Sequence, residues 1–271
     1  MRFFLLALLT ASVLTVTLSP VAQASGPLSQ YFLTTSDGYD KLYAVQGENV
    51  TLNATTGPGQ YALAVSTTVK ILGVNASTSG KEYTMRGVPT GTTYSNTVAG
   101  ALFADGTTDG VHNYAWSFNN GVAYRFAADW TSPQVLFALG TSSGSRRGVT
   151  YDPLTNSLWI SGMNGAVGAL VENYTLDGTF LSGFSTGQAD ITALALDPAD
   201  GTLWLGHYDH TGTYQQYNRS GERIGSVTYQ SLFPAGVVGG EFAIILPEPG
   251  TGLLAATGLV LLAGKRRRRE V

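Results

Sequence analysis

The most constraining feature of the sequence is a pattern that occurs twice, one period apart. Asp152 and Asp197 are separated by 45 positions, and so are Trp159 and Trp204. Each copy consists of a strand, an Asp-Pro turn, a strand with Trp, a strand with Tyr, a Gly turn and a last strand. A sheet of four strands cannot cover both of its faces, so it needs neighbouring copies on either side. This period predicts an all-β fold, a β-propeller of about five four-stranded blades.

A weaker copy of the pattern precedes these two. Asp105, within Ala101–Gly106, aligns with Asp152 at a distance of 47 positions, and Trp116 takes the place of Trp159. Farther upstream, Lys41–Val45 and Gln60–Val74 are candidates for one or two further blades that lack these landmarks.

The end of the body fits a closed ring. Gly239–Ile244 resembles the first strand of a copy that is never finished. In a closed propeller, a strand from one terminus completes the blade of the other terminus and removes an exposed sheet edge. We therefore expect Gly239–Ile244 to complete the N-terminal blade.

Short runs bounded by Gly, Asn and Asp recur along the body, which is typical of all-β chains. The strands expected from these runs are Gln60–Val65, Thr68–Leu72, Tyr114–Phe118, Val122–Phe126, Val135–Leu139, Leu158–Ser161, Leu203–His207 and Ile224–Tyr229. The alternative fold is a β-sandwich, which short strands permit but a 45-residue period does not predict.

The repeats loosely resemble propellers of the NHL and lactonase types. The resemblance rests on Ala193-Leu-Ala-Leu-Asp-Pro198 followed by Gly201-Thr-Leu-Trp204, and on the matching residues of the preceding copy. It implies a fold only, because propellers serve as hydrolases, lyases and binding modules alike.

The first 24 residues have the parts of a secretory signal peptide. Arg2 supplies the positive start, and Phe3–Leu18 is apolar except for scattered Thr and Ser. The secretion translocon is expected to export the chain. Ala22-Gln23-Ala24 is an A-x-A site, so a signal peptidase is expected to cut between Ala24 and Ser25. An uncleaved anchor is the alternative. The body, residues 25–246, is therefore expected outside the cytoplasm.

The C-terminal segment, residues 247–271, has three parts in a fixed order. Pro247-Glu248-Pro249 is a rigid breaker, because each proline fixes φ and lacks an amide donor. Gly250–Gly264 is an uncharged and mostly apolar run, shorter than the roughly 20 residues that span a bilayer. The basic cluster that follows is typical of a stop-transfer segment and is expected on the cytoplasmic side. It consists of Lys265, Arg266, Arg267, Arg268 and Arg269.

This three-part tail resembles the PEP-CTERM sorting signal of Gram-negative bacteria. The resemblance implies that an exosortase, a membrane transpeptidase-like protease, recognises Pro247, Glu248 and Pro249. It implies that Leu253–Ala263 holds the precursor in the inner membrane for a time. The mature protein would then reach the envelope, the cell surface or an exopolysaccharide matrix. An ordinary tail anchor, which would leave the protein permanently in the periplasm, is the alternative.

Composition limits the partners of the body. The two terminal segments hold six of the 15 Lys and Arg residues and two of the 18 Asp and Glu residues, so the body keeps 9 and 16. A net charge near −7 argues against nucleic acid as a partner. The chain has no cysteine, which excludes disulfides, thiolate nucleophiles and Cys-ligated metals.

Candidate metal and catalytic residues are few. His207, Asp209 and His210 form the densest polar group, but their spacing on a strand and turn favours a polar loop over a metal site. Asp105-Gly and Asp109-Gly, like Asp197-Pro, are interpreted as turns, with calcium at such a loop as the minor alternative. Asp152 and Asp197 recur with the repeat, which indicates a structural role.

The sequence therefore predicts an exported protein without catalytic residues, metal or other cofactor. We expect a binding or structural module at a bacterial surface or in an extracellular matrix, with polysaccharide as a candidate partner. The alternative function is an exported propeller hydrolase or lyase of lactonase type, with acidic and His residues converging on a central metal. Asp, Glu, His and Asn clustered at one mouth of the channel would favour the enzyme. A mouth lined by Ser, Thr and apolar groups would favour the binding module.

Overall fold

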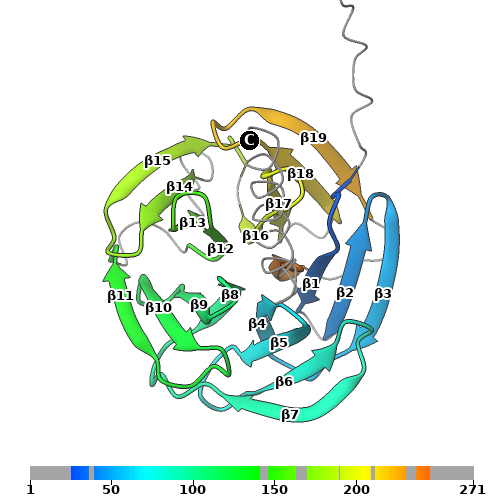
Figure 1. The fold of residues 1–271 in the computed structure, drawn as a ribbon, viewed down its shortest axis with the longest axis vertical. Coiled ribbons are helices and arrows are strands. Elements are labelled where there is room, and N and C mark those ends of the chain that lie inside the picture. The colour runs from blue at the N-terminus through cyan, green and yellow to red at the C-terminus, as the bar shows by residue number, and fades with distance from the viewer. Residues whose placement is uncertain are drawn as a thin grey trace, which may run out of the picture.

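Five four-stranded antiparallel sheets stand around a common axis like the blades of a propeller (Figure 1). The computed structural model describes residues 26–36, 40–140, 146–162, 170–188, 190–208, 211–229 and 236–244. The predicted propeller of about five blades is confirmed, and the alternative β-sandwich is wrong. The predicted signal peptide, residues 1–24, and the C-terminal segment, residues 247–271, lie outside the described residues. Within the described ranges, no helix has the length and apolar character needed to cross a membrane.

In every blade the four strands follow one another from the axis outward. Blade 1 contains β20 (Val237–Phe242), β1 (Tyr31–Thr35), β2 (Lys41–Gln46) and β3 (Asn49–Thr55). Blade 2 contains β4 (Gln60–Val65), β5 (Thr68–Gly73), β6 (Ser79–Thr84) and β7 (Pro89–Ser95). Blade 3 contains β8 (Phe103–Thr108), β9 (His112–Ser117), β10 (Val122–Ala127) and β11 (Gln134–Ala138). Blade 4 contains β12 (Val149–Asp152), β13 (Ser157–Ser161), β14 (Leu170–Thr175) and β15 (Phe180–Ser185). Blade 5 contains β16 (Ile191–Leu196), β17 (Leu203–His207), β18 (Thr213–Tyr217) and β19 (Arg223–Thr228).

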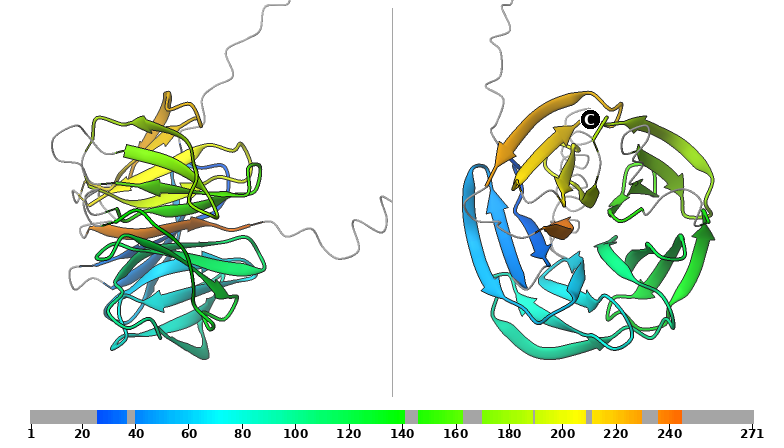
Figure 2. Two further views of the ribbon diagram at one scale, coloured as in Figure 1. Left: turned by 90° about the vertical axis from the view of Figure 1, so that its left-hand side faces the viewer. Right: turned by 180° about the vertical axis from the view of Figure 1, so that it is seen from behind.

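The ring closes as the unfinished last repeat predicted. Strand β20, from the C-terminal end of the body, is the innermost strand of blade 1 and pairs antiparallel with β1. In this pairing Tyr31 lies opposite Phe242, and Leu33 lies opposite Gly240. Figures 1 and 2 show the two ends of the body side by side in this blade. Strand β20 therefore covers the inner edge of β1, which would otherwise be open.

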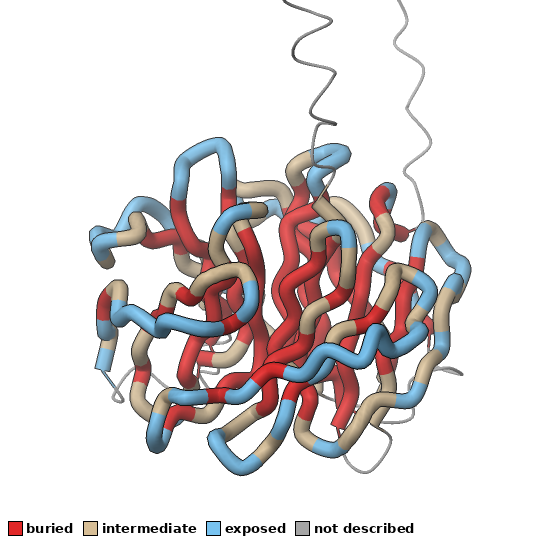
Figure 3. The backbone as a smooth tube through the Cα atoms, turned by 60° about the horizontal axis from the view of Figure 1, so that its bottom comes forward, coloured by how far each residue is buried: buried red, intermediate tan, exposed pale blue. Residues whose placement is uncertain are grey.

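Apolar packing lies between blades rather than inside them. The described residues form five buried clusters, and each joins side chains of two neighbouring blades. Trp116 packs at the interface of blades 3 and 4, Trp159 at that of blades 4 and 5, and Trp204 at that of blades 5 and 1. Figure 3 shows buried segments through the middle of the body and exposed segments at the turns. These three Trp residues are therefore part of the packing between blades.

One carboxylate lies at the axis of the propeller. Asp105, in the middle of β8, is completely buried. Its Oδ1 accepts hydrogen bonds from the amides of Gly106 and Gly240, each at 2.9 Å. Its Oδ2 accepts from the amides of Val149, at 3.1 Å, and Leu194, at 3.0 Å. These donors belong to the innermost strands of four blades, so a single side chain ties most of the ring together.

The position of Asp105 corrects the alignment of the weaker repeat. Asp109, not Asp105, directly follows the inner strand β8 at the turn, and it precedes Trp116 by seven positions. Asp152 precedes Trp159 by the same seven positions. Asp105 therefore lies within strand β8, and its expected role as a turn residue is wrong. Two Asp-Gly pairs four residues apart made the alignment ambiguous.

Threonine side chains add links between neighbouring blades. Each of four threonines bonds the main chain of the next blade, and together they join blades 1 to 2, 3 to 4, 4 to 5 and 5 to 1. The bonds are Thr34 Oγ1 to the Tyr61 carbonyl, the Tyr151 amide to Thr107 Oγ1, the Leu196 amide to Thr150 Oγ1, and Thr192 Oγ1 to the Val237 carbonyl.

Replacing Asp105 by Asn is expected to destabilise the propeller strongly. In either orientation the new amide nitrogen faces two buried main-chain N–H groups, which then have no acceptor. A buried polar group left without its partner costs about 1–3 kcal/mol. We therefore expect the free energy of unfolding, measured by urea denaturation, to fall by roughly 2–6 kcal/mol. Asp177→Asn, in an exposed turn, is the control and should change little. Equal stability of Asp105→Asn and the wild type would contradict this role.

Candidate functional site

The innermost strands all run toward the same mouth of the propeller, where their ends surround a cavity. The cavity has a volume of about 310 Å³. Its walls come from four of the five blades, and the residues that line it are Thr108, Asp109, Tyr151, Pro153, Leu196, Pro198, Glu241 and Ile244. Pro153 and Pro198 are exposed and form its rim, whereas Thr108, Leu196 and Glu241 are buried. A cavity of this size is at the small end of ligand pockets.

Glu241 is the most enclosed polar group of this cavity. It lies on β20, and its exposed fraction is 3%. Oε1 accepts a hydrogen bond from the Phe242 amide at 3.1 Å, and Oε2 has no hydrogen-bond partner among the described residues. Burial raises the pKa of Glu241 well above its ordinary value, and the nearby Asp105 carboxylate raises it further. The Thr107 hydroxyl and the Phe242 amide act in the opposite direction.

Asp109 is the second carboxylate of the cavity, and its oxygens are occupied. Oδ1 accepts from the amides of Val111 and His112, at 2.7 and 2.6 Å, and Oδ2 accepts from the Tyr114 hydroxyl at 2.6 Å. Partial burial raises the pKa of Asp109, but these hydrogen bonds outweigh it and hold the pKa below its ordinary value. Asp109 therefore contributes a fixed negative charge rather than a free acceptor.

The hydroxyl groups that line the cavity donate within the protein. Tyr151 donates to Asn156 Oδ1 at 2.9 Å, and its ring stacks on Tyr114 at 5.7 Å between centroids. Thr108 donates to the His112 carbonyl at 2.8 Å. A ligand in this cavity would therefore meet apolar walls, a negative charge and one unpaired carboxylate oxygen.

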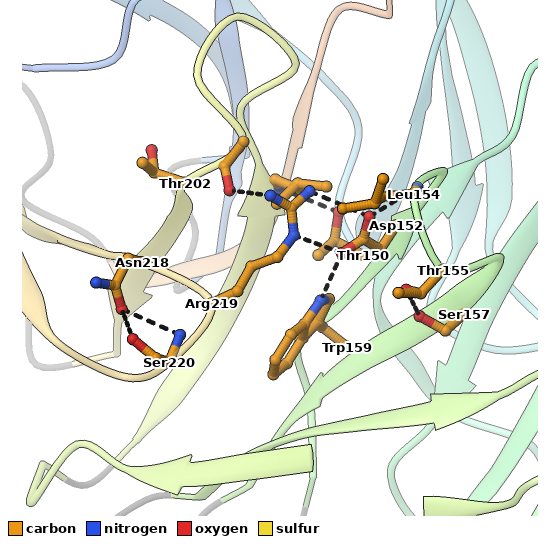
Figure 4. Close-up of polar contacts among 12 residues, drawn as sticks. Thr150, Asp152, Leu154, Thr155, Ser157, Trp159, Thr202, Asn218, Arg219 and Ser220 are labelled. Atoms are coloured by element: carbon orange, nitrogen blue, oxygen red, sulfur yellow. Dashed lines mark hydrogen bonds and ion pairs between the residues drawn. The ribbon is translucent and has the colours of Figure 1, made fainter. Parts of the chain in front are cut away.

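The two aspartates of the clear repeats hold blades together, as their recurrence predicted. Asp152 is completely buried, and Arg219, from the β18–β19 turn of the next blade, contacts both of its oxygens at 2.7 and 3.1 Å (Figure 4). Trp159 Nε1 donates to the same carboxylate at 3.1 Å. Asp197 accepts hydrogen bonds from the Leu28 and Ser29 amides, which precede the first strand of blade 1.

Of the residues His207, Asp209 and His210, His207 alone is described, and it does not line this cavity. His207 is buried at the end of β17, and Asp209 and His210 lie outside the described residues. Among the residues that the structure describes, no three His, Asp or Glu side chains are grouped so that they could hold a metal ion. The sorting and cleavage residues all lie outside the described residues as well. They are Ala24, Ser25, Pro247, Glu248, Pro249, Lys265, Arg266, Arg267, Arg268 and Arg269.

Sequence reasoning missed Glu241 and Tyr151 as site residues. Tyr151 precedes the Asp-Pro turn of its blade and was visible only as part of the repeat. Glu241 stands in the unfinished last repeat, where a charged residue interrupts an otherwise apolar inner strand. A charge in a strand expected to be buried on both faces is the signal that could have identified it.

The comparisons with known proteins bear on the fold. No protein-family model matches the chain, and no curated protein matches its sequence. A chain in the crystal structure of a nidogen/laminin complex is similar in structure, with a TM-score of 0.55 and 13% sequence identity. The match covers 80% of this chain and 98% of that chain. That chain is also a propeller, so the likeness supports the propeller fold and carries no function with it.

Removing the charge of Arg219 is expected to weaken the link between blades 4 and 5. Arg219→Met keeps an apolar stem but leaves the buried Asp152 carboxylate without its cation. Breaking a buried pair costs about 3–5 kcal/mol, but the Arg219 side chain is 32% exposed, so we expect about 1–3 kcal/mol. Arg223→Met, at an exposed position nearby, is the control.

Burial raises the pKa of Asp152, but the contacts of Arg219 and Trp159 hold it below its ordinary value. The free energies of unfolding of the wild type and Arg219→Met, measured by urea denaturation, should therefore become equal only in acid, where Asp152 is protonated.

Glu241 is expected to make the stability of the propeller fall as the pH rises. Burial raises the pKa of Glu241 in the folded chain, so the folded state keeps a proton that the unfolded state releases above about pH 4.3. The free energy of unfolding should decline as the pH rises above that value. In Glu241→Gln, which carries no titrating group there, the decline should be smaller. Glu222→Gln, at an exposed turn, should keep the wild-type slope. Equal slopes for Glu241→Gln and the wild type would contradict the raised pKa.

Proposed function

We propose that this protein is an exported, non-enzymatic binding module of a bacterial cell surface or extracellular matrix, and that the mouth of its propeller is the binding face. The observation that carries the proposal is the cavity where the ends of four blades meet. A closed ring of rigid strands that presents a pocket through its turns is a common arrangement for recognition, since the scaffold positions the loops.

The surface around the cavity supports a binding role. Val111 follows the Asp109-Gly turn and Leu154 follows Pro153, and their side chains are 68% and 76% exposed. Two large apolar side chains are thus exposed within two residues of Asp109 and Pro153, which line the cavity. The lining itself is mostly apolar with threonine and tyrosine, and one of its two carboxylates is occupied by internal hydrogen bonds. This composition fits the binding module better than the propeller hydrolase or lyase.

Export and sorting rest on the terminal segments. The signal peptide, with cleavage between Ala24 and Ser25, supports export through the secretion translocon. The Pro247-Glu248-Pro249 tail with its basic cluster supports sorting by an exosortase-type protease. Ile244, the last described residue, borders the cavity. The described part of the chain therefore ends beside the proposed binding face. This route of delivery suggests a polysaccharide-containing extracellular matrix as the place where the binding face acts.

The sorting proposal is tested by the intact mass of the protein in each cell fraction. We expect a species that starts at Ser25 and ends near Pro247–Pro249, recovered outside the inner membrane. Glu248→Ala should accumulate in the inner membrane with its basic cluster intact. Glu270→Ala removes a carboxylate from the same tail and should be processed like the wild type.

A wild-type species that keeps Arg266–Arg269 and occurs only in the inner membrane would contradict the sorting proposal. The tail would then be a plain anchor, and the binding face would act in the periplasm.

A further inference from the structure

We infer that the cavity at the mouth of the propeller binds a primary ammonium group carried on an alkyl stem, such as the lysine side chain of a partner polypeptide. This inference rests on the proposed function, since it assigns the ligand class of the same binding face. It depends on the contacts of the cavity and not on where the protein is sorted.

The first argument is the balance of donors and acceptors. The Tyr151 and Thr108 hydroxyls donate within the protein, and the Asp109 oxygens accept within it. Among the described residues, Glu241 Oε2 is the lining side-chain oxygen that is buried without a hydrogen-bond partner. For the ionised form of Glu241, the polar group that suits this site must therefore bring N–H or O–H donors and needs no donor in return. An ammonium group has three donors and no acceptor.

The second argument is charge. Glu241 and Asp109 both border the cavity, and no Lys or Arg is among its described lining residues. The body as a whole is near −7 from its composition, which raises the local concentration of cations at such a mouth. A buried carboxylate gains most from a ligand that is both its hydrogen-bond donor and its counter-charge.

The third argument is the shape and polarity of the walls. Pro153, Leu196, Pro198 and Ile244 contribute apolar surface around Glu241. An alkyl stem can cover this surface while its charged end reaches the carboxylate. A sugar would bring several hydroxyls to walls that offer them few partners. A hard metal ion takes about six or more oxygen ligands, whereas the described lining of this cavity offers a single unpaired carboxylate oxygen.

The proposal also implies that binding depends on pH. Groups that face Glu241 are Asp105 and Thr107 on β8 and Tyr31 on β1, with Asp109 and Tyr151 along the same cavity. None of these is a cation, so an empty site favours the protonated form of Glu241. An incoming ammonium group favours the ionised form, so binding should release a proton and strengthen as the pH rises.

The test is calorimetric titration of the full-length chain with pentylamine and with 1-pentanol, its neutral counterpart. We expect pentylamine to bind at one site at least about tenfold more tightly than 1-pentanol, and more tightly at pH 8 than at pH 5. Glu241→Gln should weaken pentylamine binding at least about tenfold, because it removes a charge-assisted hydrogen bond. Glu222→Gln removes one surface charge and should bind as the wild type does.

Three results would overturn the assignment. They are equal affinity of the wild type for pentylamine and 1-pentanol, unchanged affinity in a folded Glu241→Gln, and tighter binding of glucosamine than of pentylamine. Tighter binding of glucosamine would show that the ligand is an amino sugar and not an amine on an alkyl stem. The comparison of the charged and neutral probes uses the wild type alone, so it decides even if the variant fails to fold. Failure of amine binding would leave the intact-mass result untouched, and the reverse also holds.

Discussion

The carboxylate of Asp105 is the constraint on which the ring depends. A propeller has no hydrogen-bonded sheet that runs across its centre, so the inner strands need some other contact to hold their spacing. Four main-chain amides, from the innermost strands of four blades, point at one side chain and share its two oxygens. Burial alone raises the pKa of Asp105, and the four amide donors oppose that effect by favouring the charged form. The centre is thus occupied by polar contacts, while the apolar packing lies between the blades.

Away from the axis, other aspartates also accept hydrogen bonds from neighbouring segments of the ring. Asp152 reaches Arg219 of the following blade, whereas Asp197, in the same place of the next repeat, reaches the main chain before blade 1. The equivalent Asp109 bonds residues of its own blade instead. A recurring aspartate at the end of an inner strand can therefore join blades or shape the mouth, according to what the neighbouring blade presents. Where the aspartate does not reach the next blade, between blades 3 and 4, it becomes the second carboxylate of the cavity.

The sequence predicted those features that follow from the repeated pattern of strands, and it failed where single side chains meet distant segments. The 45-residue period, the eight expected strands and the closure by β20 follow from strand length and burial, which each blade repeats. Asp105 could not be placed, because its partners are amides up to 135 positions away and a spacing of 47 was as acceptable as one of 43. Glu241 could not be recognised as a site residue, because its environment exists only after the ring has closed. Its one visible signal was a charge in a strand that should be buried.

Asp105 and Glu241 differ in how far the protein itself satisfies their hydrogen bonds. Both are buried near the axis and influence each other's protonation, and both have a raised pKa because of burial. Asp105 has four amide donors from its own chain, so nothing remains for a ligand to supply. Glu241 has one amide donor and the Thr107 hydroxyl to favour its charged form. Its Oε2 has no partner among the described residues, and it lies beside a cavity with an exposed rim. A buried acid without a hydrogen-bond partner is costly. The same fold gives Asp105 four amide donors, whereas it leaves Glu241 Oε2 without one among the described residues. That contrast is the physical reason to regard the mouth, and not the axis, as the place where this propeller meets its partner.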